Sequence, residues 1–188
     1  MTKNKLIDLE NIYKNLLESI GEDINREGLL LTPKRAAKGL LDLTNGYEQK
    51  TEDVLNNAVF KSDIREMILV KNIEFYSLCE HHILPFFGKC HIGYMPTGKI
   101  IGVSKIPRLI NLYAKRLQVQ EHLTVQIALA LKQLTAARGV GVVIDANHMC
   151  MMMRGVEKQN PIMTTTHMLG CFKTKLSVRS EFLSLIKI

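Results

Sequence analysis

The sequence predicts an α+β protein with a largely antiparallel sheet. Three short runs rich in β-forming residues, at 68–77, 88–96 and 98–104, precede two helical segments. Two further β-rich runs, at 139–153 and 163–172, follow those helices. Strands, then helices, then strands again differ from the regular alternation of parallel βαβ units, so an antiparallel sheet is expected.

The segments between and after the strands also have clear patterns. Residues 104–116 and 119–137 are predicted to be helical, and the second segment carries apolar residues on one helix face. Apolar residues in 176–186 indicate a closing helix. The segment 81–87, between the first two β-rich runs, is expected to be a loop.

The N-terminal part is predicted to be helical. Apolar residues spaced three and four apart indicate an amphipathic helix over 6–20 that ends at Gly21. A second helix is expected to begin with Thr32 as its N-cap and Pro33 at the first helical position, and to end at Asn45-Gly46.

These helices define an expected N-terminal helical lobe at 1–50, followed by a second domain at 51–188. The first part of that second domain, 51–66, is polar and irregular, so it is expected to be a connection.

Composition and charge restrict the class of protein. The 188-residue chain is 46% hydrophobic and 23% charged, which is typical of a globular protein. No stretch approaches the roughly 18 apolar residues of a membrane-spanning helix. Asp8 and Glu10 stand where a signal peptide would be apolar, so we expect a cytoplasmic protein. The net charge of +7 favours a polyanionic partner, but the lack of Trp and of an Arg-rich tract argues against nucleic acid.

The four cysteines are Cys79, Cys90, Cys150 and Cys171. A cytosolic chain normally keeps its thiols reduced, so metal binding or catalysis is the better use for a cysteine among histidines. Cys90 and Cys171 lie on expected strands with apolar neighbours and are interpreted as buried thiols.

One short motif concentrates reactive groups. In Cys79-Glu80-His81-His82, a single turn of chain can present the Cys79 thiolate and the His82 imidazole to one metal ion. A second His and Cys occur in the segment 147–150. Cys79, His82 and Cys150 would leave the fourth position of a zinc ion to water, as in catalytic sites. The alternative is that an isolated Cys-x-x-His pair is a coincidence, with cysteine acting as a small buried hydrophobic residue.

Longer motifs resemble those of GTP cyclohydrolase I. They are "TPKR", "SLCEHHILPFFGKCHIGYMP", "GVSKIPRLINLYAKRLQVQEHLTVQIA", "HMCMMMRGV" and "TTTHMLGCF", and the resemblance runs from about Thr32 to the C-terminus. It implies the tunnelling (T-) fold, in which an antiparallel β-sheet carries two long helices on one face and N-terminal helices precede it.

The resemblance also implies the activity. A zinc-dependent hydrolase acting on cyclic amidine C–N bonds would convert GTP and water to 7,8-dihydroneopterin triphosphate and formate, the first step of tetrahydrofolate and pterin biosynthesis. Cys79, His82 and Cys150 would hold Zn²⁺. His81 and His148 would be the catalytic acid and base. Without the resemblance, a buried structural histidine is an equally good interpretation of His148.

The expected substrate contacts also follow from the resemblance. Gln120 and Glu121 match the pair that reads guanine, although a first-turn glutamate is also favoured by the helix dipole alone. The triphosphate would be bound by Ser104, Lys105, Arg108, Arg154 and Arg35. Each of these five residues, taken singly, could equally be a solvated surface residue.

The resemblance further implies a homodecamer. Sheets would join edge to edge around a ring, which removes open strand edges, and two rings would stack. Active sites would lie at subunit interfaces, so Arg35 and Cys79 of one site are expected to come from different chains.

Two other classes stay open. One is a T-fold relative that acts on another purine or a deazapurine, such as a reductase with a lone nucleophilic cysteine. The other is a non-enzymatic structural-zinc or nucleic-acid-binding module, which would need a fourth protein ligand and a basic face.

Overall fold

The computed structural model describes residues 2–56 and 58–187, and the chain divides into two compact units, Met1–Asn45 and Gly46–Ile188. The domain boundary expected at residue 50 stays a prediction, because a compact unit need not fold on its own.

The first unit contains helices α1 (Thr2–Ser19) and α2 (Thr32–Leu43), with the short 3-10 helix η1 (Glu27–Leu29) between them. The expected N-cap at Thr32 is wrong, because Leu31 occupies that position and Thr32 already belongs to the helix. The hydroxyl of Thr32 instead donates to the carbonyl oxygen of Gly28 at 3.3 Å. Pro33 is therefore the second residue of α2 and not the first, as was expected, although it still lies in the first turn.

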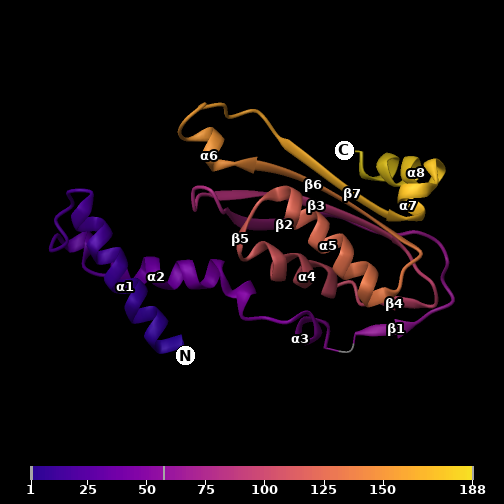
Figure 1. Ribbon diagram of the computed structural model, residues 1–188, viewed down its shortest axis with the longest axis horizontal. Helices are drawn as coiled ribbons and strands as arrows, with labels where there is room; N and C mark the ends of the chain where they lie inside the picture. The colour runs from indigo at the N-terminus through magenta and orange to yellow at the C-terminus, as the bar shows by residue number, and fades with distance from the viewer. Residues whose placement is uncertain (1, 57, 188) are drawn as a thin grey trace. The chain divides into compact units, whose positions relative to one another are not determined.

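The second unit is built on a five-stranded sheet in the order β5-β2-β3-β6-β7 (Figure 1). The three pairs formed by β2, β3, β6 and β7 are antiparallel, and β5 pairs with β2 in parallel. The strands are β2 (Ile68–Cys79), β3 (Pro85–Met95), β5 (Leu117–Gln118), β6 (Gly139–His148) and β7 (Met163–Gly170). The expected α+β class with a largely antiparallel sheet is therefore confirmed.

Two helices, α4 (Lys105–Ala114) and α5 (Gln120–Thr135), pack on one face of this sheet (Figure 1). Alternate strand residues such as Phe75, Phe86 and Ile144 point into a core shared with these helices. This helix layer on a single face, with helices preceding the sheet in the chain, agrees with the architecture expected of the tunnelling fold.

The opposite face is partly covered by α7 (Cys171–Thr174) and α8 (Leu176–Ile186), which confirms the closing helix. Phe172 packs so closely on Gly141 that a β-carbon there would lie 2.6 Å from the ring. Glycine is therefore required where the C-terminal helices meet the sheet. Cys171 begins α7, so its expected place on a strand is wrong, although its thiol is buried as expected.

Three other segments differ from expectation. The segment 51–66 contains α3 (Thr51–Leu55) and β1 (Val59–Lys61). Strand β1 pairs with β4 (Lys99–Ile101) in a separate two-stranded sheet, so the third expected strand lies outside the main sheet. The long β-rich run at 139–153 ends as a strand at His148 and continues as α6 (Met149–Met152).

A 3-10 helix, η2 (Asn45–Tyr47), follows the expected end of the second helix.

Among the described helices, none has both the length and the apolar character required to cross a bilayer.

Candidate active site

The side chains of Cys79, His82 and Cys150 converge in the second unit. Their ligand atoms all lie within 4.8 Å of one another, and the Cys79 sulfur is 3.8 Å from His82 Nδ1. Within residues 2–56 and 58–187, no other group of three His, Cys, Asp or Glu side chains is close enough to hold an ion. The sequence interpretation had grouped the same three residues.

A tight turn between β2 and β3 places the first two of these side chains. The Cys79 N–H donates to the Leu84 carbonyl at 2.8 Å, and the Ile83 N–H donates back to the Cys79 carbonyl at 2.8 Å. Ile83 adopts a positive φ of 55°, which is unusual for a β-branched residue. The backbone therefore turns sharply at the Cys79–His82 motif, and His82 can fold back towards Cys79.

The third side chain comes from the change of structure at the end of β6. Strand β6 pairs with β3 up to His148, opposite Phe86, and the chain then enters the single turn of α6. That turn carries Cys150. The Cys150 sulfur on this turn lies within 4.8 Å of the ligand atoms of Cys79 and His82.

The donor set suits a soft divalent metal. Two thiols and one imidazole are ligands that favour zinc, and three protein ligands leave a position open. Cys79 is buried whereas His82 is exposed, so the cluster has one side towards solvent. Burial, followed by the neighbouring Cys79 thiol, raises the pKa of the Cys150 thiol. A bound cation would favour the thiolate forms and offset this effect.

His148 lies two residues before Cys150 and is held on two sides. Its ring stacks on Phe86, with centroids 4.7 Å apart and planes 2° apart. Its Nε2 is 2.8 Å from Oε1 of Gln120. Burial lowers the pKa of His148, and the negative charge of Glu121 partly offsets that effect. His148 is therefore fixed and partly desolvated beside the candidate metal ligands.

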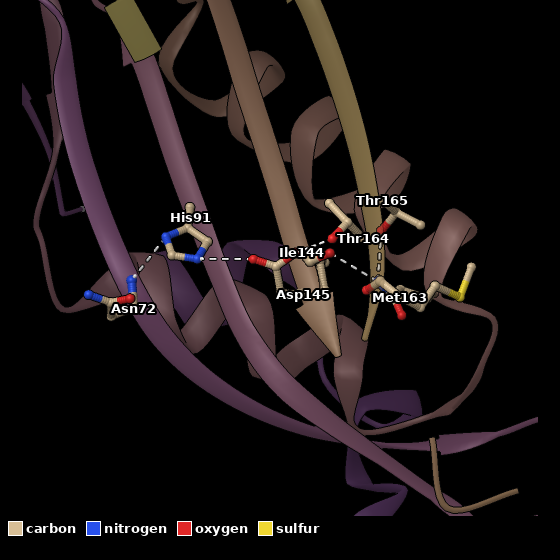
Figure 2. A network of polar contacts seen from close by, with 8 residues as sticks. Asn72, His91, Ile144, Asp145, Met163, Thr164 and Thr165 are labelled. Atoms are coloured by element: carbon tan, nitrogen blue, oxygen red, sulfur yellow. Dashed lines mark hydrogen bonds and ion pairs between the residues drawn. The ribbon is translucent and has the colours of Figure 1, made fainter. Parts of the chain in front are cut away.

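Gln120 is the first residue of α5 and is 1% exposed. Its Nε2 donates to the carbonyls of Ile144 and Met163, at 3.0 and 2.8 Å, and to Thr165 Oγ1 at 3.1 Å. Figure 2 shows Ile144 on β6, with Met163 and Thr165 on the neighbouring strand β7. The side-chain amide of Gln120 is thus engaged within the protein.

The other expected residues near this centre are exposed. Glu121 lies in the first turn of α5, close enough for its charge to act on His148. Arg154 follows α6, and its positive charge opposes the rise that burial and Cys79 cause in the pKa of Cys150. The His81 ring lies nearly perpendicular to that of His82, at 86° and with centroids 6.2 Å apart. The two adjacent imidazole rings are therefore not stacked on one another.

The expected phosphate-binding residues are not gathered at this centre within the unit. Ser104, Lys105 and Arg108 lie at the N-terminal end of α4. The C-terminal end of that helix leads into β5, which pairs with β2 at Cys79. A ten-residue helix is about 15 Å long, so these residues lie towards the opposite end of the sheet from the cluster. Arg35 belongs to α2 of the first unit.

Sequence reasoning missed Phe86, Thr124 and Thr165. Thr165 stands in a run of three threonines, and alternation along a strand indicates only that it faces the side opposite to its neighbours. Nothing in the sequence distinguishes Phe86 from the neighbouring Phe87. The pairing of Phe86 with His148 depends on the register of β3 against β6.

A second polar group lies on the other face of the sheet. Figure 2 shows His91 between Asn72 and Asp145, with Thr164 beyond Asp145. His91 is 1% exposed, and its Nδ1 accepts the Asn72 N–H at 3.4 Å. An open hollow of about 600 Å³ lies on this face, and none of the three candidate ligands lines it. His91 was given no role from sequence, and its burial identifies it as a structural histidine.

The structure is an α+β sheet with two helices on one face, and it brings together three side chains that could hold a metal ion next to a fixed histidine. Three protein ligands with an open position are the arrangement of a catalytic metal site. The family model for GTP cyclohydrolase I matches residues 9–187. GTP cyclohydrolase 1 of Methylococcus capsulatus is 58% identical over 178 residues, covering 95% of this chain and 96% of that protein. GTP cyclohydrolase 1 2 of Pseudomonas aeruginosa is 59% identical over 181 residues, covering 96% and 100%. The chain belongs to the GTP cyclohydrolase I family.

Solved structures of low sequence identity also share part of the fold. The apo form of an archaeosine synthase QueF-Like is 14% identical and has a TM-score of 0.47, covering 55% of this chain and 93% of that one.

Proposed function

We propose that the protein is a zinc-dependent GTP cyclohydrolase that converts GTP and water to 7,8-dihydroneopterin triphosphate and formate. The reaction would be the first step of tetrahydrofolate and pterin biosynthesis, carried out in the cytoplasm. The observation that carries this proposal is the convergence of Cys79, His82 and Cys150 beside His148 in a chain of this family.

Each ligand has a role that its chemistry supports. Cys79, His82 and Cys150 would hold zinc through two sulfurs and one imidazole nitrogen, since their ligand atoms lie within 4.8 Å of one another. Zinc, when bound in such a three-ligand site, supplies a Lewis acid that makes hydroxide available near neutral pH.

Two histidines would move the protons. Opening the five-membered ring of guanine requires protonation of the departing nitrogens, and imidazole is suited to this near neutral pH. His148 is partly buried beside the cluster and lacks a freely rotating ring, which favours proton transfer at a fixed position. His81 is exposed on the turn that also carries His82, so it can approach a bound substrate from the solvent side.

Glu121 would select guanine. One carboxylate can accept both the N1–H and the N2–H of guanine, whereas adenine offers no such pair of donors. The exposure of Glu121 in the first turn of α5, within electrostatic reach of His148, supports this role. Gln120 would contact the guanine base through its main-chain N–H. The N–H groups in the first turn of a helix have no acceptor within that helix, so this donor is available to a ligand.

The phosphates would be bound in part by a second copy of the chain. Ser104, Lys105 and Arg108 lie towards the other end of the sheet from the cluster, where a helix N-terminus and two cations favour an anion. Arg154 lies close to Cys150. A homodecamer with shared active sites, to which Arg35 would also contribute, would unite these groups. This arrangement accounts for their separation within one chain.

The alternatives are less well supported. A structural-zinc module would require a fourth ligand, and the cluster has three members among the described residues. A T-fold reductase would require a lone nucleophilic thiol, whereas Cys79 has a second thiol and an imidazole beside it.

The zinc site is tested by metal content and activity together. Cys79→Ala and Cys150→Ala should each lose bound zinc and GTP turnover while keeping most of the helical circular dichroism signal. Cys90→Ala is the matched control, because Cys90 is a fully buried thiol on β3 outside the cluster. A Cys79→Ala protein that keeps one zinc per chain and normal turnover would contradict the assignment.

A further inference from the structure

The orientation of the Gln120 amide follows from its surroundings. The carbonyl oxygens of Ile144 and Met163 can only accept hydrogen bonds, and they lie 3.0 and 2.8 Å from Gln120 Nε2. The amide nitrogen must therefore face β6 and β7. The amide oxygen is then the atom directed at His148, 2.8 Å from its Nε2.

Two hydroxyl groups fix the same orientation. Thr124 Oγ1 donates to the main-chain carbonyl of Gln120 at 2.7 Å, which uses its single proton. At the 2.7 Å contact between the two threonines, Thr165 Oγ1 must then be the donor to Thr124 Oγ1. Thr165 Oγ1 is left as an acceptor for Gln120 Nε2 at 3.1 Å. The two protons of Gln120 Nε2 are thus shared among three acceptors, Ile144 O, Met163 O and Thr165 Oγ1, all of which require the amide nitrogen to face them.

From this geometry we propose that Gln120 is a positioning residue that holds neutral His148 in the tautomer with its proton on Nε2. The Gln120 oxygen can only accept, so the hydrogen bond at 2.8 Å requires an Nε2–H on His148. Nδ1 is then the unprotonated nitrogen of neutral His148, able to accept a hydrogen bond. The proposal rests on the proposed function for the role of His148 and deepens it. It assigns the Gln120 side chain to holding His148, and no longer to reading the guanine base.

A second contact holds the same ring. The His148 ring stacks on Phe86, with centroids 4.7 Å apart and planes 2° apart. The hydrogen bond to Gln120 therefore sets the tautomer of His148, and the stack on Phe86 sets the plane of its ring.

The direct test is the tautomer of His148 in the zinc-loaded protein. Solid-state ¹⁵N NMR of histidine-labelled protein at about pH 8, above the ordinary histidine pKa, distinguishes a protonated from an unprotonated ring nitrogen. His148→Gln identifies the resonances by their loss. We expect protonated Nε2 and unprotonated Nδ1. Finding the proton on Nδ1 would overturn the proposal whether or not the protein turns over GTP.

Variants separate positioning from base reading. Gln120→Leu should lose the single-tautomer spectrum and lower kcat about tenfold or more, with little change in KM for GTP. A rise in KM at unchanged kcat and unchanged spectrum would show that the side chain reads the base, and would overturn the proposal.

A milder variant covers the case in which Gln120→Leu does not fold. Thr165→Val removes only the hydroxyl that orients the amide, and should produce the same change in the His148 spectrum to a smaller extent. Thr166→Val is the matched control, since Thr166 is exposed on the same strand and points to the other face. Identical His148 spectra in the wild type, Thr165→Val and Thr166→Val would contradict the proposed hydrogen bonding from Thr165 through Gln120 to His148.

Discussion

The ring of His148 lies parallel to that of Phe86, with centroids 4.7 Å apart and planes at 2°. Phe86 is fully buried in the core between the sheet and the helix layer, so a rigid part of the fold supports the histidine nearest the metal cluster. This contact depends on the register of β3 against β6, in which Phe86 lies opposite His148.

Phe86→Leu is therefore expected to reduce kcat about tenfold through loss of ring orientation, beyond any effect on stability. Removal of part of a buried aromatic side chain should also lower the free energy of unfolding by about 1–3 kcal/mol. Phe75→Leu is the control, because Phe75 is equally buried and contacts Phe86 edge-on at 5.9 Å. Equal kcat in the two variants would show that the stack has no role in turnover.

Glu121→Gln should weaken GTP binding, because an amide cannot accept both N1–H and N2–H of guanine. We expect KM for GTP to rise about 10- to 100-fold and discrimination against other purine nucleotides to diminish. Steady-state kinetics with GTP, ITP and ATP measure both effects. His122→Gln, at the next exposed position of α5, should leave KM unchanged. If Glu121→Gln keeps the wild-type selectivity among these nucleotides, another residue must recognise the guanine base.

Stability should depend on pH through His91. Its pKa is lowered mainly by burial; Asp145 opposes that shift, and Lys89 and Lys71 add to it. Because the folded-state pKa lies below the unfolded value, the unfolded chain binds more protons in the interval between them. Stability is therefore fully present above about pH 6.5 and decreases as the pH falls through this interval.

Urea unfolding between about pH 5 and 8 measures this dependence. His91→Gln should flatten the profile. Asp145→Asn should steepen it, since the carboxylate that raises the pKa of His91 is removed. A profile that is the same in His91→Gln and wild type would assign the dependence to other groups.

Removal of the metal should expose the cluster to oxidation. The sulfurs of Cys79 and Cys150 lie within 4.8 Å of each other, so small movements could bring them to bonding distance. After chelation in air, dissolved oxygen should remove two hydrogens and leave a disulfide between them. Peptide mass spectrometry should show this crosslink in the stripped protein and its absence in the zinc-loaded protein. Both thiols free after prolonged exposure would contradict the prediction.

The sequence predicted the elements with long periodic patterns well. The helix at 119–137 and the strands within 68–77 and 88–96 were identified because one face of each is apolar and buried in the core. The single turn of α6 was missed, because four residues rich in methionine have no helical period to detect. The pairing of β1 with β4 joins residues about forty positions apart, which local pattern alone cannot indicate.

The sequence grouped the three candidate ligands that the structure brings together, but it did not indicate the contacts that support them. Cys79, His82 and Cys150 are chemically distinctive, and the resemblance to a known family grouped them. The hydrogen bonds that link His148 to Gln120 and Gln120 to Thr165 depend on where β7 passes α5. A threonine in a sequence gives no indication of which helix its strand will pass. The separation of Ser104 from the cluster likewise could not be predicted, because it depends on the direction in which α4 runs.

The most direct measurement is incubation of the purified, zinc-replete protein with GTP, with and without prior chelation, following formate release and pterin absorbance together. We expect both products to form in equal amounts and only when the metal is present. Absence of both from zinc-replete, fully assembled protein would contradict cyclohydrolase activity, and the Cys79–His82–Cys150 cluster would then be a metal site without turnover of GTP.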